Sequence, residues 1–329
     1  MIVLCPMKRV FSLLIVLFIS INVFGQSAFA EASRLLAAKK YVAAESLLAE
    51  AVKANSSDLR LKELYGDALG HQEKWNEAID VYKSLAQADL QNAEYFYKYG
   101  GAMGMKALAV SKLKALGMIG DIRNAFLKAA ELDPNHIDVR WALVEFYMQL
   151  PGIVGGSEKK ATKYANELLK LSPVDGYLAK GYIAEYNEDF EAAEKAFKMA
   201  VQTGGSEHTY EKLTTLYEVH NKPFKAIETA QECLETHKNN RFHYQIGKIA
   251  ASYNINTELG INCLKTYIEK YSIRDGVPKD WAYYRLAQIY RKQGDKEVAT
   301  NYIAKALVDR PDFKEALQEK SLIEQMPCC

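Results

Sequence analysis

The chain has 329 residues, 49% of them hydrophobic and 25% charged, which is the composition of an ordinary folded protein. Its 42 lysines and arginines nearly balance its 41 aspartates and glutamates, giving a net charge of +1 with neutral histidines. This balance excludes a chain that is basic throughout, so we expect no nucleic-acid partner. The length suits two or three compact domains or one long repeat array.

The first thirty residues have the pattern of a cleaved signal peptide. Lys8 and Arg9 precede an apolar run over residues 10–21, which is too short for a comfortable membrane span. Ala28-Phe29-Ala30 then offers small residues at both positions that signal peptidase reads before a cut at Glu31. We therefore expect residues 1–30 to be a signal peptide and the protein to be exported, either periplasmic or secreted.

A second cut is compatible with the same segment. Cleavage after Val23-Phe24-Gly25 would leave Gln26 as the first residue of the mature chain. An uncleaved N-terminal anchor is the remaining alternative. No apolar run after residue 30 is long enough to cross a bilayer, so we expect no membrane span in the mature chain.

Two sets of mostly small residues recur at related intervals along the rest of the chain. Apolar residues three and four apart predict amphipathic helices, and one hairpin cannot bury both of its apolar stripes, so neighbouring hairpins must stack. The first set marks the second helix of each hairpin: Ala44, Ala78, Ile122, Ala161, Ala193, Ala226, Gly260 and Ala299. The second set marks the middle of first helices, where a missing side chain lets two helices touch: Gly66, Gly100, Gly181 and Gly247.

The last repeat, residues 280–311, carries the fullest pattern. Its two helices, the turn between them and the closing proline are marked by Leu286, Ala287, Tyr290, Gly294, Asp295, Ala299, Ile303, Ala306 and Pro311. These positions resemble the tetratricopeptide repeat, a helical hairpin of about 34 residues. The resemblance covers most of residues 31–326 and is good around residues 58–86 and 122–134.

The resemblance implies an all-α fold, a right-handed superhelical solenoid of antiparallel helix hairpins. We expect about eight repeats over residues 31–311, with first helices lining a concave groove and the first repeat serving as a cap. Residues 312–329 follow as a C-terminal capping helix with a Cys-Cys tail. Insertions are expected at three places: near residues 104–120, 150–157 and 271–279.

The resemblance also implies that first-helix side chains facing the groove bind a partner. Eight residues hold such positions: Tyr97, Trp141, Tyr182, Tyr244, Lys248, Tyr284, Gln288 and Arg291. Aromatic rings on a rigid wall suit an extended peptide, although such rings can equally pack between repeats. Glu63 and Asp67 stand where carboxylate-binding members of the family need cations, which argues against recognition of a terminal carboxylate.

Two insertions invite functional hypotheses. The glycine-rich loop of residues 150–157 could hold an anion at the start of the next helix, although a shaped turn is the favoured interpretation. Residues 104–120 combine leucines with lysines and could dock a partner helix or lie against lipid headgroups. The simpler alternative for this second segment is a lengthened core helix.

Four cysteines follow the leader. Cys233 and Cys263 fall near the ends of second helices, where we favour buried thiols over a disulfide. For Cys328 and Cys329 we favour a frayed tail over metal chelation, a bond to a partner or a vicinal disulfide.

We expect no enzyme, and we assign no catalytic residue, no metal site and no cofactor. The six histidines form no His-Glu-x-x-His pair, and the chain has no Cys-x-x-Cys, Gly-x-Ser-x-Gly or phosphate-loop pattern. His208, His220 and Glu185 would favour an enzyme only if they converged in a pocket. The predicted function is a protein–protein interaction scaffold that binds a partner protein or peptide in the groove. The alternative is a small-ligand or glycan-binding protein that uses the same aromatic side chains.

Overall fold

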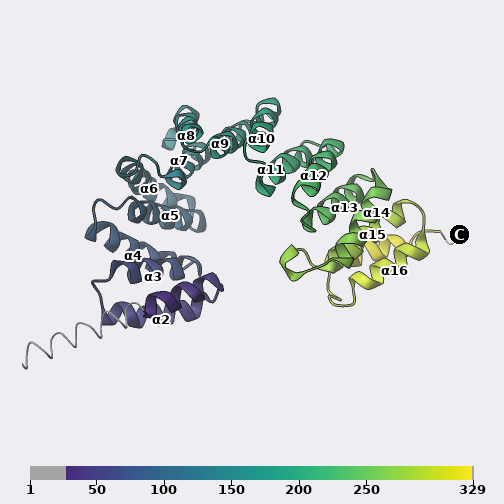
Figure 1. The fold of residues 1–329 in the computed structure, drawn as a ribbon, viewed down its shortest axis with the longest axis horizontal. Helices are drawn as coiled ribbons and strands as arrows, with labels where there is room; N and C mark the ends of the chain where they lie inside the picture. The colour runs from purple at the N-terminus through teal and green to yellow at the C-terminus, as the bar shows by residue number, and fades with distance from the viewer. Residues whose placement is uncertain (1–26, 328–329) are drawn as a thin grey trace, which may run out of the picture. The chain divides into compact units, whose positions relative to one another are not determined.

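The computed structural model describes residues 27–327, and these residues contain helices and turns but no strand. The chain divides into two compact units, Met1–Leu171 and Ser172–Cys329. In each unit, successive helices pack as antiparallel hairpins (Figure 1). The predicted all-α repeat solenoid is therefore confirmed. No helix in the described residues is long and apolar enough to cross a membrane.

The described part of unit 1 contains four hairpins. Residues 27–37 form a helix that packs with the next one in the first hairpin. The remaining helices of the unit are α2 (Tyr41–Ala54), α3 (Leu59–Gly70), α4 (Trp75–Ala88), α5 (Ala93–Ala109), α6 (Lys112–Leu132), α7 (Ile137–Gln149) and α8 (Glu158–Leu171), with a short 3-10 helix, η1 (Gly152–Val154), between the last two.

The described part of unit 2 contains four further hairpins and a final helix. Its helices are α9 (Pro173–Tyr186), α10 (Phe190–Gly204), α11 (Glu207–Val219), α12 (Pro223–His237), α13 (Arg241–Tyr253), α14 (Thr257–Glu269), η2 (Ile273–Asp275), α15 (Lys279–Lys292), α16 (Lys296–Ala306) and α17 (Lys314–Glu324). Helix α17 buries Ala316 and Ile323 with Phe313 against α15 and α16, so it covers the last hairpin.

The repeated small residues are the points of closest helix contact. A Cβ placed at Gly66 would lie 2.6 Å from the Tyr82 ring, and one at Gly181 would lie 2.2 Å from the Phe197 ring. Real Cβ atoms do not approach other heavy atoms so closely, so these positions accept only glycine while the helix spacing is kept. The first set, which marks the second helices, is buried as well, with seven of its eight members in the apolar core. Both sequence patterns are confirmed as packing patterns.

The three predicted insertions take different forms. Residues 104–120 lengthen α5 and α6 to 17 and 21 residues and include the turn between them. Residues 150–157 form η1 and a tight turn in which Gly155 adopts a left-handed φ of 106°. Residues 271–279 form η2, which begins at a capping box between Ser272 and Asp275.

The helix at residues 27–37 bears on the predicted cut before Glu31. Ala28 is 4% exposed and belongs to the first hydrophobic cluster with Ala32 and Leu35, and Phe29 packs against the same cluster. The Ser33 hydroxyl donates a hydrogen bond of 2.8 Å to the carbonyl of Phe29. A cut before Glu31 would therefore remove core residues, whereas one before Gln26 would keep them. Residues 1–26 lie outside the described part of the chain.

The two described cysteines are buried free thiols, as predicted. Cys233 lies in α12 and Cys263 in α14. Burial raises the pKa of Cys233 to about 12 and that of Cys263 to about 11, so both thiols stay protonated and act as small apolar groups. Cys328 and Cys329 lie outside the described residues.

Hydrogen bonds and ion pairs of Glu194, on α10, join three helices of unit 2. Its carboxylate accepts hydrogen bonds of 2.7 Å from Lys225 Nζ on α12 and 2.7 Å from the Tyr217 hydroxyl on α11. Lys198 Nζ lies 2.9 Å from the same carboxylate. Desolvation alone would raise the pKa of Glu194, but these three donors outweigh it and lower that pKa to about 2. The carboxylate is therefore ionised throughout the neutral range.

Candidate functional site

The richest arrangement of polar and aromatic side chains in the described residues lies on the first helices of unit 1. Lys98, on α5, projects its ammonium between carboxylates of the preceding hairpin. Lys98 Nζ lies 2.7 Å from Glu63 Oε1 and 2.8 Å from Asp67 Oδ1, both on α3. Glu94, one turn before Lys98, adds a third carboxylate at 3.9 Å. One ammonium faces three carboxylates, so the group keeps a net negative charge.

Burial would lower the pKa of Lys98, but the charges and hydrogen bonds of Asp67 and Glu63 outweigh it and raise that pKa. The ammonium is therefore fixed in place rather than available as a free cation. The Tyr82 hydroxyl of α4 also donates to Asp67 Oδ1 at 2.7 Å. Through this hydrogen bond, the carboxylates around Lys98 are linked to the core, where the Tyr82 ring packs against Gly66.

Glu94 extends the group toward α7 through His136. Glu94 Oε2 lies 3.1 Å from His136 Nε2, and His136 Nδ1 accepts the backbone N–H of Val139 at 3.3 Å. Because Nδ1 accepts, Nε2 is the ring nitrogen that donates a hydrogen bond to Glu94. The imidazole thus caps the start of α7 and holds the Glu94 side chain.

Tyr97 completes the group, which we call the acid–aromatic cluster: Glu63, Asp67, Tyr82, Glu94, Tyr97, Lys98 and His136. The Tyr97 ring lies 5.0 Å from the His136 ring and 6.3 Å from the Phe126 ring, centroid to centroid. Burial, followed by the nearby charges of Asp138 and Glu94, raises the pKa of Tyr97 to about 12. The phenol is therefore neutral, and the side chain is half-buried.

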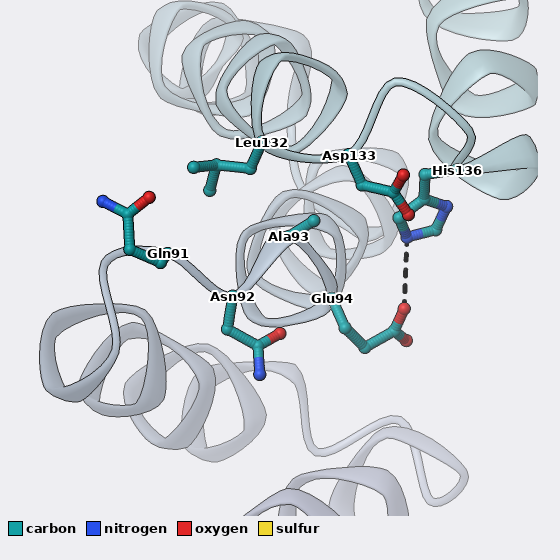
Figure 2. Close-up of a pocket in the computed structure, with 7 residues that line it drawn as sticks. All are labelled: Gln91, Asn92, Ala93, Glu94, Leu132, Asp133 and His136. Atoms are coloured by element: carbon teal, nitrogen blue, oxygen red, sulfur yellow. Dashed lines mark hydrogen bonds and ion pairs between the residues drawn. The ribbon is translucent and has the colours of Figure 1, made fainter.

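A polar pocket of about 430 Å³ opens beside the cluster (Figure 2). It lies between the two loops that lead into α5 and α7. Figure 2 shows the Glu94 carboxylate and the His136 ring meeting at one end, with Asp133 next to the imidazole. Its lining residues are Gln91, Asn92, Ala93, Glu94, Leu132, Asp133 and His136.

Of the predicted groove residues, only Tyr97 and Trp141 belong to unit 1. Both are half-buried, and Trp141 occupies in α7 the position that Tyr97 occupies in α5. The structure therefore places Tyr97 in the acid–aromatic cluster and Trp141 on the next first helix.

In unit 2, the predicted tyrosines are largely in the core. Tyr244 is 7% exposed and packs 5.4 Å from the Tyr267 ring, and Tyr284 is 8% exposed and packs 5.5 Å from Phe313. Their rings fill space between repeats, which was the stated alternative, so they offer little surface to a partner. Tyr182 is half-buried, with its ring 6.4 Å from Tyr186.

The predicted polar residues of unit 2 are bonded to neighbouring side chains. Lys248 lies 2.9 Å from Glu218 of α11, and Arg291 pairs with Glu319 of α17. Gln288 donates to the Tyr284 hydroxyl at 2.8 Å. All three of these side chains are therefore engaged with neighbours within unit 2.

Sequence reasoning missed Lys98, Glu94 and His136 as members of the site. One signal was present, because Asn92 and His136 both cap first helices one repeat apart. A second signal was the acidity of Glu63 and Asp67, which argues against binding of a terminal carboxylate and also indicates a nearby cation. The cation that pairs with them, Lys98, comes from the next repeat, 35 residues after Glu63 and 31 after Asp67.

The structure places Glu185 near His220, two of the residues considered above as possible catalytic groups. Glu185 is half-buried, and burial raises its pKa while Lys212 and His220 act in the opposite direction. The His220 ring instead packs 4.9 Å from Phe190. Within the same residues, no three His, Cys, Asp or Glu side chains gather in a way that could hold a metal ion.

No protein-family model and no curated protein sequence matches the chain. Among solved structures, the chain is similar to yeast Tom70 at 17% identity, over 87% of this chain and 58% of that one, with a TM-score of 0.57. It is also similar to a tetratricopeptide repeat protein from Parabacteroides merdae at 14% identity, over 92% and 99% of the two chains, with a TM-score of 0.48. A third similar structure is YrrB, described as a TPR protein with an unusual peptide-binding site, at 21% identity, over 60% and 98%, with a TM-score of 0.43. The chain thus has the fold of tetratricopeptide repeat proteins, as its repeats predicted.

Proposed function

We propose that this protein is a non-enzymatic interaction scaffold, exported to the cell envelope or secreted, that binds a partner protein or peptide along the first helices of unit 1. The observation that carries the proposal is the acid–aromatic cluster, in which three carboxylates share one ammonium beside a half-buried tyrosine. Such a surface attracts cations and offers a flat ring for apolar contact.

The chemistry of the cluster defines the partner segment. A lysine or arginine of the partner would lie against Glu63 and Glu94, where negative charge is left over. An apolar or aromatic side chain would lie on Tyr97. We therefore propose an extended, basic segment as the ligand and not a C-terminal carboxylate.

Helix α5 leaves room for such a segment. Gly101 and Gly104 follow Tyr97 by four and seven residues, so all three share one face of the helix. A Cβ at either glycine would meet no atom within 4 Å, which distinguishes these two from the tightly packed Gly100. A bound chain can therefore approach the α5 backbone along this face.

Export is proposed from the leader pattern, and the core contacts of Ala28 and Phe29 support a cut before Gln26 over one before Glu31. The mature chain would then begin one residue before the described helix.

The proposal is tested by crosslinking capture from native extract with the chain starting at Gln26. Gly101→Arg places a bulky cation on the open face of α5 without displacing a neighbour, so it should abolish capture of the main partner. Gly120→Arg on α6 is the matched control, because a Cβ at Gly120 also meets nothing within 4 Å. Peptides from the captured partner should bind more weakly when their lysines and arginines are replaced by glutamine. Equal capture by both variants would refute the proposed surface.

A further inference from the structure

The α5–α6 hairpin is longer than the others in the described chain. Its helices have 17 and 21 residues, whereas the remaining α-helices from α2 onward have 11 to 15. At 1.5 Å per residue, the extra residues lengthen the hairpin by roughly 3 to 9 Å at its turn. We call residues 105–116, which contain this turn, the hairpin tip.

The tip carries a concentration of exposed aliphatic side chains. Leu108 is 73% exposed and Leu113 is 81% exposed, and Met105 and Leu116 are each 47% exposed. These four are among only fourteen large hydrophobic side chains that are exposed in the described residues. Four within twelve residues form a patch rather than the scatter expected of an ordinary surface.

The charged residues of this segment all have one sign. Residues 99–120 contain Lys106, Lys112 and Lys114 and no aspartate or glutamate, so the segment carries three positive charges. The chain as a whole is nearly neutral. The tip is therefore a local basic and aliphatic surface.

The neighbouring hairpin turn has the same character. In a stack of antiparallel hairpins, the turns within successive hairpins lie at one edge, and α6 packs against α7. The α7–α8 turn carries Ile153, which is 95% exposed, and Glu158, Lys159 and Lys160 follow it. An exposed aliphatic side chain followed by lysines thus recurs at this edge of unit 1.

We propose that the hairpin tip and the Ile153 turn dock on an anionic lipid surface. The leucines and Ile153 would enter the boundary between headgroups and acyl chains, and the lysines would contact lipid phosphates. The aliphatic side chains are exposed at a helix-to-helix turn, and the lysines beside them complement the charge of lipid phosphates. This is attachment to one face of a membrane, in agreement with the absence of a membrane-spanning helix in residues 27–327.

The test is flotation of the chain starting at Gln26 with phosphatidylcholine vesicles, with and without about one third phosphatidylglycerol. The protein should float with the anionic vesicles, and binding should weaken as salt rises. The Leu108→Asp, Leu113→Asp double variant and the Lys112→Glu, Lys114→Glu double variant should each lower the partition coefficient at least tenfold. Leu90→Asp is the matched control, because Leu90 is 61% exposed and lies in the loop at the opposite edge of the hairpins.

Failure of the chain to float with anionic vesicles would overturn the proposal. Flotation that all three variants retain, or that Leu90→Asp weakens as much as the others, would also overturn it. Circular dichroism of each variant identifies loss of binding caused by loss of fold. The vesicles contain no protein, so the result is independent of the partner proposed for the acid–aromatic cluster.

Discussion

The adjacent glycines of α5 give a sharp test of how the hairpins are spaced. Gly100→Ala would place a Cβ 2.8 Å from Cδ1 and Cε1 of Phe126 and 3.3 Å from the Ala125 Cβ. Carbon atoms prefer separations of at least about 3.5 Å, so the ring would have to move by about 0.7 Å. Phe126 is only 6% exposed and has little room to do so. Gly101→Ala meets nothing within 4 Å.

Both alanines gain the same helix propensity, about 0.8 to 1 kcal/mol. Gly101→Ala should therefore stabilise the protein by about that amount. Gly100→Ala carries in addition an overpacking cost of about 1 to 3 kcal/mol, so it should be neutral or destabilising by up to about 2 kcal/mol. The difference between the two variants isolates the cost of the contact.

Urea unfolding of both variants, with amide exchange measured in α5 and α6, provides the measurement. The unfolding midpoint should rise for Gly101→Ala and fall or stay unchanged for Gly100→Ala. Exchange should quicken in α5 and α6 only for Gly100→Ala. Equal midpoints and equal exchange in the two variants would show that the recurring glycine is not required by the approach of the second helix.

Three further predictions concern stability. A chain starting at Glu31 should be about 1 to 2 kcal/mol less stable in urea than one starting at Gln26, because it lacks buried Ala28; equal stability would contradict the core assigned to residue 28. Glu194→Gln should destabilise the protein by about 1 to 2 kcal/mol at pH 7. A carboxyl whose folded pKa is lowered contributes stability above its unfolded pKa and loses that contribution as the pH falls toward its folded pKa. Between pH 4.5 and about pH 2, the melting temperature of Glu194→Gln should therefore fall less than that of the unchanged protein. If both proteins lose the same stability over this range, the hydrogen bonds to Glu194 do not stabilise the fold. Tyr284→Ala should lower the free energy of unfolding by about 3 to 5 kcal/mol, because the ring is buried, while leaving partner capture intact at low temperature. Loss of capture without loss of stability would show that Tyr284 contacts the partner.

The fold was readable from the sequence because its determinants are local and periodic. Four first-helix glycines each contact a bulky side chain of the following helix: Gly66, Gly100, Gly181 and Gly247. The need for a residue without a side chain at this contact therefore recurs four times in the sequence. The packing of two helices within a hairpin depends only on residues of that hairpin. It therefore appears in the sequence as a pattern that repeats about every 34 residues.

The candidate site was less readable because it depends on contacts between repeats. Tyr97 and Tyr244 occupy the same register, yet the first is half-buried and the second is 7% exposed. What differs is the neighbouring packing, where the Tyr267 ring lies 5.4 Å from Tyr244. Register assigns a residue to a face of its helix, but side chains from adjacent helices decide whether that face remains open.

The two proposed surfaces of unit 1 have opposite charge, which makes their contributions separable. Glu94→Gln removes a carboxylate from the acid–aromatic cluster and keeps the polar contact to His136, so it should weaken binding of a basic peptide a few-fold and leave vesicle binding unchanged. Lys112→Glu should do the reverse. Because the two residues share no contact, the double variant should show both losses with coupling below about 0.5 kcal/mol, measured by titration with peptide and with vesicles. A larger coupling would mean that a single ligand spans both surfaces, and the division of unit 1 into a peptide-binding face and a lipid-binding edge would then be wrong.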